Sequence, residues 1–233
     1  MLPGDVLLIS GKGKISKTLI TAQKAIYPNA KSSHVELSLG DGVFIHATSD
    51  DGVHITILTD EDKACNGEWR VIRHKSITER GNVTQSLQIA ATYHAQQGYN
   101  RIFMGKGNDH SSFCSELVAK SYAKAGINII NGKQPSKVTP AHFDKEADQL
   151  VDWIDVTAEY QTLLSEMKLN EFQYRMVAGL ISTKFKMRQN TEAFRDVLLE
   201  ALEGGTEVER NTADRLKAML GERELKFWYE KKK

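Results

Sequence analysis

The chain has 233 residues, of which 40% are hydrophobic and 26% are charged, as is usual for a soluble globular protein. This length allows one large domain, or one domain with an appendage. The net charge of +1 gives no sign of a protein that binds nucleic acid or a membrane surface, and we expect no nucleic-acid partner. No apolar run approaches the length needed to cross a bilayer, so we expect no transmembrane segment.

The N-terminal sequence and the cysteines indicate in which cellular compartment the protein is made. The segment Met1–Asp5 lacks the basic region and the long apolar core of a signal peptide. We therefore expect synthesis in the cytoplasm without a signal peptide, with export by a dedicated secretion system as an open alternative. Cys65 and Cys114 form no C-x-x-C pair, so they indicate neither a zinc site nor, in a reducing compartment, a structural disulfide. Cys65 has no basic neighbour in the sequence and is interpreted as an incidental thiol.

The chain begins with a predicted strand and a predicted helix. The apolar run over residues 6–10 is bounded by glycine and suits a buried strand, and residues 16–26 have apolar positions near helical spacing. The segment Gly11–Lys14 between them invites comparison with a phosphate-binding loop. However, Leu8 and Ile15 stand where that motif requires Gly and Ser or Thr, so we interpret the segment as a solvated loop.

The stretch from Ser33 to Thr48 predicts a β-hairpin that carries two histidines. Apolar and polar residues alternate over 35–39, which is the period of a half-buried strand, and Gly40-Asp41-Gly42 suits a tight turn. A second apolar run over 43–45 follows. His34 opens the first strand and His46 ends the second apolar run, so the hairpin folds them toward each other. We expect the two imidazoles to meet at one end of the sheet.

Two more strands and two helices follow. Residues 53–58 and 69–74 alternate as strands, and His54 and His74 fall on their polar phase, where we expect them to be exposed. Residues 77–98 predict an amphipathic helix, and 99–110 a polar loop. The next helix begins around Ser111–Glu116, with a serine available as N-cap and a glutamate one turn later, and ends at Gly126.

Cys114 lies in the first turn of that helix, where unpaired backbone N–H groups favour a thiolate. A neighbouring imidazole can accept the thiol proton, and a third group can fix the tautomer of that imidazole. We therefore predict Cys114 as nucleophile, His34 as general base and then acid, and His46 as the residue that orients His34. The Cys114 N–H is expected in the oxyanion hole, with a nearby tyrosine or His110 as side-chain donor. A buried structural cysteine is the alternative.

The same segments carry a resemblance to a known family. Gly4–Leu8, Ser33–Val35, Gly40–Thr48 with Gly52-Val53, and Phe113–Val118 resemble the circularly permuted NlpC-type cysteine hydrolases. That group includes the bacterial YiiX/YebB-like proteins and, more distantly, the relatives of lecithin:retinol acyltransferase. In this group the histidine-bearing sheet precedes the cysteine-bearing helix, as it does here.

The resemblance implies a fold, an activity and a set of roles. The fold is α+β, a permuted papain-like domain with an antiparallel sheet and a cysteine-bearing helix. The activity is hydrolysis of an amide or ester through a covalent thioester, with no metal and no cofactor. Many bacterial members carry Glu at the third catalytic position, where this chain has His46, as the acyltransferase branch does. Glu36 lies two residues from His34 on one strand and is the lesser candidate for that role.

The C-terminal part has a different character. Residues 157–233 contain no proline and no strand pattern, and predict helices over 157–168, 171–188, 191–203, 206–220 and 222–230. We therefore divide the chain into a hydrolase domain over 1–155 and a helical extension over 156–233 that packs on it. The extension carries no chemical motif. It is the expected contact for an immunity protein or a secretion component.

These predictions combine into one preferred function and two alternatives. The preferred function is a cysteine amidase or endopeptidase acting on the stem peptide of peptidoglycan, delivered as an antibacterial effector. The enzymatic alternative is a lipid acyl hydrolase or acyltransferase, which His46 favours and the lack of a membrane anchor disfavours. The other alternative is a catalytically silent binding module, against which the presence of Cys114, His34 and His46 argues.

Overall fold

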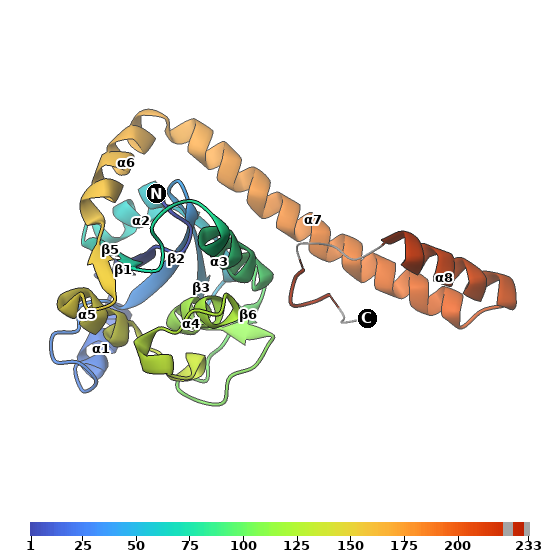
Figure 1. The fold of residues 1–233 in the computed structure, drawn as a ribbon, viewed down its shortest axis with the longest axis horizontal. Helices are drawn as coiled ribbons and strands as arrows, with labels where there is room; N and C mark the ends of the chain where they lie inside the picture. Colours follow the sequence, from blue (N-terminus) through green and yellow to red (C-terminus); the bar gives the residue numbers. More distant parts are fainter. Residues whose placement is uncertain (221–225, 231–233) are drawn as a thin grey trace.

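The computed structural model describes residues 1–220 and 226–230. Figure 1 shows a compact body around a sheet, from which one long helix extends with a shorter helix folded back beside it. The helices are α1 (Lys14–Gln23), α2 (Leu58–Cys65), α3 (Asn82–Tyr93), α4 (Cys114–Lys124), α5 (Pro140–Gln149), α6 (Thr157–Leu169), α7 (Glu171–Glu203) and α8 (Glu207–Leu220). Two short 3-10 turns, Ile130–Gly132 and Pro135–Lys137, join α4 to α5.

The body is built on a six-stranded sheet in the order β4-β3-β2-β1-β5-β8, with every neighbouring pair antiparallel. The strands are β1 (Val6–Ile9), β2 (His34–Gly40), β3 (Val43–Thr48), β4 (Gly52–Ile57), β5 (Trp69–His74) and β8 (Trp153–Asp155). A two-residue parallel pair, β6 (Gly98–Tyr99) and β7 (Ser111–Ser112), lies outside this sheet. The central strands β1 and β2 are almost fully buried, as their apolar runs predict.

Helices cover the sheet on both sides (Figure 1). Helix α4 contacts β2 and β3, and α3 contacts α4 and β2. Helices α2, α6 and α7 contact β4 or β5. The resulting core includes large side chains from every layer, among them Phe44, Tyr122, Trp153 and Tyr160, each less than 2% exposed.

A buried carboxylate fastens α6 to the sheet. The carboxylate of Asp5, at the start of β1, accepts hydrogen bonds from the Tyr160 hydroxyl at 2.8 Å and from the Arg73 guanidinium at 2.7 and 2.8 Å. Arg73 also pairs with Glu159 of α6 at 2.9 Å. Because Asp5 is fully buried, these partners compensate the cost of removing its charge from water. The helical extension therefore begins as part of the packing of the body.

Beyond α6 the chain forms an arm. Helix α7 runs without a break through Gly179 and Asn190, where the sequence predicted interruptions, and α8 packs back against it. A single glycine costs a helix only about 1 kcal/mol, which packing of α7 on the body and on α8 outweighs. The predicted helix over 222–230 lies partly outside the described residues, and 226–230 form a turn rather than a helix. No helix among the described residues is long and apolar enough to span a membrane, as predicted.

The tail returns to the body. The Trp228 indole donates to the Ala95 carbonyl at 2.9 Å, and the Trp228 N–H donates to the Tyr93 carbonyl at 3.0 Å. Phe227 is 1% exposed and packs on Phe185 of α7. These contacts connect the end of the described chain both to α3 and to the arm.

Candidate active site

The pairing of β2 with β3 brings the polar residues of the hairpin together. Leu37 lies opposite Ile45, so continuation of this register places Glu36 opposite His46. His34 is two residues before Glu36 and therefore shares its face of the strand. In the next pair, β3 with β4, His46 lies opposite His54. Three imidazoles and one carboxylate thus come from three adjacent strands.

The Glu36 carboxylate lies between two of these imidazoles. Its Oε1 is 2.6 Å from His46 Nδ1 and 3.3 Å from His34 Nε2. Glu36 is completely buried. Burial alone raises the pKa of Glu36, but the charges and hydrogen bonds of His46 and His34 outweigh it and lower that pKa to about 2. Glu36 is therefore ionised over the whole physiological pH range.

The hydrogen-bond pattern assigns the protons of His46. The Nδ1 atom of His54 lies 3.0 Å from the Gly52 carbonyl, which only accepts, so His54 Nδ1 must donate. Burial lowers the pKa of His54, so its other nitrogen, Nε2, accepts from His46 Nε2 at 2.8 Å. His46 Nδ1 faces the Glu36 carboxylate and must also donate. Both ring nitrogens of His46 are thus engaged, by Glu36 and by His54, and His46 Nδ1 also lies 3.1 Å from His34 Nε2.

The Cys114 thiol completes the cluster from the first turn of α4. It lines the same cleft as His34, and the groups that lower its pKa are the His34 imidazole and the backbone N–H groups of Val35 and Ser115. Burial raises the pKa of the thiol, but the charge and hydrogen bond of His34 outweigh this, and the pKa is lowered. Burial likewise lowers the pKa of His34, but the thiolate and Glu36 raise it well above its usual value. Both shifts favour the thiolate form of Cys114 and the imidazolium form of His34.

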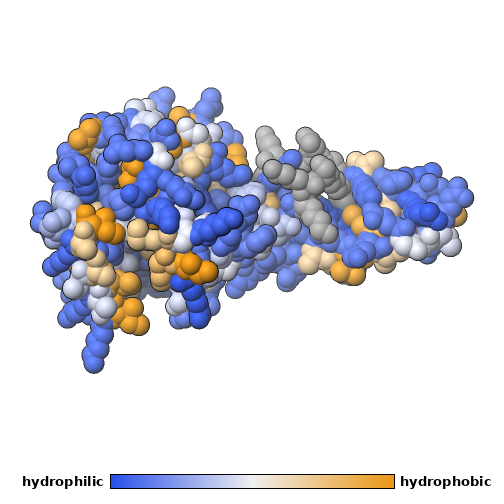
Figure 2. Space-filling view, turned by 90° about the horizontal axis from the view of Figure 1, so that it is seen from below, coloured by the Kyte–Doolittle hydropathy of each residue, from blue (hydrophilic) through white to orange (hydrophobic). Residues whose placement is uncertain are grey.

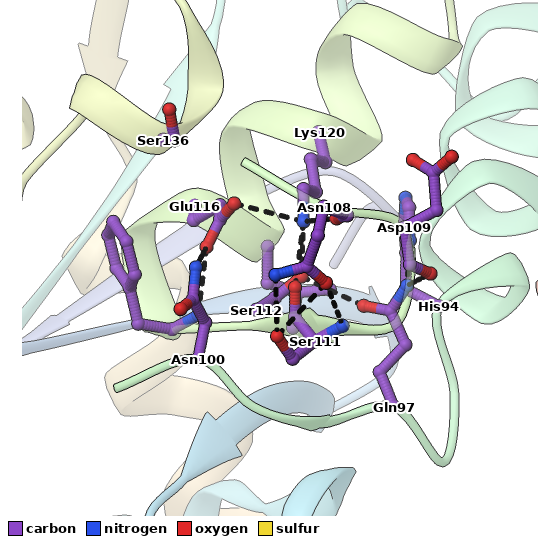
Figure 3. Close-up of polar contacts among 12 residues, drawn as sticks. His94, Gln97, Asn100, Asn108, Asp109, Ser111, Ser112, Glu116, Lys120 and Ser136 are labelled. Carbon is purple, nitrogen blue, oxygen red and sulfur yellow. Dashed lines mark hydrogen bonds and ion pairs between the residues drawn. The ribbon is translucent and has the colours of Figure 1, made fainter. Parts of the chain in front are cut away.

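A network of buried polar groups holds the chain that leads into α4 (Figure 3). Glu116 is fully buried, and its Oε2 accepts from Asn100 Nδ2 at 2.9 Å and from the Phe113 N–H at 3.3 Å. Its Oε1 pairs with Lys120 at 3.0 Å, and Lys120 also donates to the Ser112 hydroxyl at 3.0 Å. The network continues to Gln97, His94, Asn108 and Ser111. These bonds fix the strand that positions Cys114.

This network corrects one prediction about the start of α4. The N-cap residue is Phe113, and no serine side chain caps the helix. Glu116 still reaches back to the N-cap N–H, which is half of the expected capping box. The helix thus begins at Cys114 itself, which places the thiol directly beside the free N–H groups of the first turn.

A cleft of about 850 Å³ opens onto Cys114, His34 and His46. One wall is α1, and the other includes Tyr99 and Phe113. The pKa of Tyr99 is raised to about 12 by burial and by the Cys114 thiolate, so its hydroxyl stays protonated beside the thiol. Glu61 also lines the cleft. Its pKa is raised to about 7, mainly by burial and also by the charge of Glu36. The apolar lining residues are Ile15, Leu19, Ala22, Ile26, Ala47, Phe103, Met104 and Pro140.

The structure brings the three predicted residues, Cys114, His34 and His46, into one cluster, and their catalytic roles stay predictions. Glu36 also belongs to this cluster, and the predictions for two other residues, His54 and His74, were wrong. Glu36, the lesser candidate, lies directly beside His34. His54, which we expected to be exposed, is half-buried and bonded to His46. The prediction that His74 is exposed was also wrong, because His74 is half-buried against Trp153.

Two secondary expectations concern His110 and Cys65. His110 stacks edge-on against Trp228, with ring centroids 5.7 Å apart, and does not line the cleft, which leaves Tyr99 as the tyrosine beside Cys114. Cys65 is buried, and burial raises its pKa, as suits an inert thiol. Register and long-range packing decide these positions, and neither leaves a local pattern in the sequence.

The same donors could also hold a metal ion. One ligand atom from each of His34, Glu36 and His46 lies within 4.8 Å of the others. Two imidazoles and a carboxylate are a suitable donor set for a divalent transition metal such as zinc. Binding there would require the nitrogens that now donate to Glu36 to give up their protons. A metal ion and the hydrogen-bonded cluster therefore exclude each other.

Comparisons with known proteins bear on this geometry. A sequence profile of a family described as permuted papain-like amidase enzymes, YaeF/YiiX, C92 family, matches residues 1–178. The chain is also similar to the crystal structure of the metalloprotein yiiX from Escherichia coli O157:H7, with a TM-score of 0.50 and 20% identity. That match covers 66% of this chain and 96% of the other, and at this identity it shows the fold alone. No curated protein matches the chain by sequence.

Proposed function

Because this chain belongs to the C92 family of permuted papain-like amidases, we propose that it hydrolyses an amide bond with Cys114 as nucleophile and binds the acyl side of that bond in its apolar cleft. The observation that carries this proposal is that Cys114 and His34 line one cleft and shift each other's pKa. The depressed pKa of the thiol and the raised pKa of the imidazole are those of an activated nucleophile and its acid–base partner.

The chemistry follows from the protonation states. The Cys114 thiolate attacks the carbonyl carbon of the amide, and the carbonyl oxygen takes up the negative charge. The His34 imidazolium then gives its proton to the amide nitrogen, the C–N bond breaks, and an amine leaves a thioester on Cys114. His34, now neutral, takes a proton from water, whose oxygen attacks the thioester carbonyl. The carboxylic acid leaves, and the thiolate–imidazolium pair is restored.

Tyr99 is the proposed side-chain donor to the oxyanion, beside the backbone N–H of Cys114. It lines the cleft, and its raised pKa keeps a proton available for donation. We expect Tyr99→Phe to lower kcat by on the order of 10²-fold, because one donor to the developing charge is lost. Steady-state kinetics on an acyl anilide would measure this, and KM should change little. An unchanged kcat would remove Tyr99 from the oxyanion hole.

The lining of the cleft supports an apolar acyl group. Four of the apolar lining residues are between 39% and 79% exposed, namely Ile15, Leu19, Phe103 and Met104. Exposed apolar side chains grouped in a cleft are typical of a binding site for an apolar ligand. Figure 2 shows hydrophobic surface gathered on the body on the side where α1 lies. Peptidoglycan stem peptides, which the sequence analysis favoured, carry several carboxylates. Among the described lining residues, Arg101 is the one lysine or arginine available to pair with them.

A chain-length series tests the substrate. We expect kcat/KM on acyl p-nitroanilides to rise steeply from two-carbon to eight-carbon acyl groups, by about 4-fold for each methylene that enters the cleft. Purified peptidoglycan would be offered in parallel and its products analysed by mass spectrometry, with Cys114→Ala as the blank. Release of muropeptides, together with a kcat/KM that does not depend on acyl length, would contradict the acyl-group proposal. It would support peptidoglycan as the substrate.

A second candidate is metal-dependent hydrolysis. The solved relative is described as a metalloprotein, and the donor set of His34, Glu36 and His46 fits a divalent ion. A bound ion would supply Lewis-acid polarisation of the carbonyl or a bound hydroxide. The two candidates differ in their response to a chelator. Activity that persists in EDTA and falls on addition of Zn²⁺ supports the thiol mechanism, whereas activity that is lost in EDTA and restored by Zn²⁺ supports the metal.

A further inference from the structure

Helix α7 has an exposed apolar face that no described part of the chain covers. The opposite face packs on the body and on α8, with Phe185 and Leu199 less than 10% exposed. Figure 2 shows hydrophobic surface along the arm as well as on the body. The exposed residues, each between 41% and 74% exposed, are Phe172, Met176, Val177, Leu180, Met187, Phe194, Val197 and Leu198. We call these eight residues the outer stripe.

Seven of the eight residues of the outer stripe, all but Phe172, are placed symmetrically in sequence about Met187. Leu180 and Phe194 lie seven residues on either side of it, Val177 and Val197 ten residues, and Met176 and Leu198 eleven residues. Thr183 and Thr191, four residues away on either side, fill the same face. A helix that packs antiparallel against its own copy brings residues equidistant from the centre together, because the two-fold axis makes each contact reciprocal. The outer stripe therefore has the pattern of an antiparallel, self-complementary seam.

We propose that two copies of this chain pair through the outer stripe of α7, antiparallel, with Met187 facing Met187 of the second copy. In this arrangement Leu180 packs on the second copy's Phe194, and Met176 on its Leu198. The spacing of three and four residues along the stripe is the one that paired helices use. From Phe172 to Leu198 the seam is about 40 Å long.

The charged residues of α7 are engaged within the chain rather than at the seam. Arg175 bonds to Asp60 and Glu171, Arg188 to Glu230, and Glu203 to Lys217 of α8. The outer stripe is therefore an apolar seam, and the antiparallel orientation follows from the mirrored positions of its residues about Met187.

The location of the seam is compatible with the fold. The body and α8 lie on the other face of α7, so the bodies of the two copies would lie on opposite sides of the helix pair. The match to the family ends at residue 178, and most of the outer stripe lies beyond it. Pairing would thus be a property that the arm adds to the amidase domain, and it does not depend on the proposed substrate.

The test measures the mass of the intact chain in solution by light scattering and sedimentation. We expect the wild-type chain at twice its 26.1 kDa, and Leu180→Lys or Phe194→Glu alone at 26.1 kDa. The double variant Leu180→Lys/Phe194→Glu should recover the dimer, because antiparallel pairing puts the new lysine against the new glutamate. If the two helices paired in parallel, the double variant would place lysine against lysine and glutamate against glutamate, and it would remain a monomer. Val208→Glu, on the exposed side of α8, is the matched control and should leave the dimer intact.

Cross-linking gives an independent readout. Met187→Cys should form a disulfide between copies on mild oxidation, whereas Leu180→Cys should do so only when mixed with Phe194→Cys. The wild type, which carries only the native Cys65 and Cys114, measures the background of disulfides that do not involve the outer stripe. A monomeric wild type, a dimer that survives both single variants, or a stripe that binds phospholipid vesicles as a monomer would each overturn the proposal.

Discussion

Cys114→Ala is expected to abolish amide hydrolysis, lowering kcat by on the order of 10⁴-fold or more. Without the thiol there is no atom to form the thioester, and His34 can only assist a direct attack by water. The fold should survive, because Cys114 is already small, lies in the first turn of α4 and is replaced by a good helix former. Kinetics on the best acyl anilide, with circular dichroism to verify folding, would measure this.

Cys65→Ala is the matched control. Cys65 is also buried, but burial raises its pKa and no imidazole among the described residues is bonded to it, so activity should be unchanged. Equal losses in the two variants would mean that the cysteines act through folding. Retained activity in Cys114→Ala would remove the nucleophile from the mechanism and favour the metal-dependent alternative.

The pH dependence of alkylation tests the same ion pair without a substrate. Because the pKa of Cys114 lies below its ordinary value of 9.0, iodoacetamide should modify Cys114 rapidly at neutral pH, and the rate should fall only as the pH drops through the lowered pKa. Cys65 should react slowly at every pH near neutrality. Amide hydrolysis also needs a protonated His34, so it should decline again as the pH rises through the raised pKa of that imidazole.

Much of the body follows from local patterns in the sequence. The alternation over 35–39, the Gly-Asp-Gly turn and the apolar run over 43–45 predict the hairpin, and the polar loop before Cys114 predicts the start of α4. The family match confirms the permuted papain-like fold and the cysteine amidase class. Helix α2 was missed because its sequence is polar. It forms because Leu58, Thr59 and Cys65 are buried, which is a tertiary contribution.

The details of the site depend on strand register, which the sequence does not reveal. The prediction that the His34 and His46 imidazoles meet is confirmed, since His34 Nε2 lies 3.1 Å from His46 Nδ1, but the prediction did not give the register. The pairing of β2 with β3 is irregular near the turn, between Ser38 and Gly40. The register that follows places Glu36, rather than His34, opposite His46. The pairing of β3 with β4 places His54 across from His46. A shift of one residue would send each side chain to the other face of the sheet, so this cluster could not be derived from alternation alone.

Glu36→Gln is expected to reduce kcat/KM by on the order of 10²- to 10⁴-fold, because the carboxylate that holds the His34 imidazolium in place is lost. Glu36 helps to raise the pKa of His34, so the decline of activity at high pH should move to lower pH in the variant. The removal of a buried charge that balances His46 should also lower the unfolding free energy by about 3 kcal/mol.

The pH dependence of the wild-type unfolding free energy reports on the same carboxylate. The pKa of Glu36 falls from its ordinary value of 4.5 to about 2 on folding, so its stabilising contribution is fully present above pH 4.5 and is lost as the pH falls toward 2. Glu36→Gln should lose that part of the acid dependence in thermal unfolding measurements. A variant that is destabilised but keeps the wild-type pH–rate profile would mean that Glu36 has a structural role only.

His46→Asn separates the two candidates for the third catalytic position. If Glu36 orients His34 directly, its carboxylate still accepts from His34 Nε2 in this variant, at the 3.3 Å contact, and the loss of activity should be smaller than in Glu36→Gln. Removal of the His46 charge should at the same time raise the pKa of Glu36 and shift the acid limb of unfolding to higher pH. A larger loss in His46→Asn than in Glu36→Gln would make His46 the orienting residue. Glu36 would then be the counter-ion that keeps His46 charged, and the catalytic order would be Cys114, His34, His46.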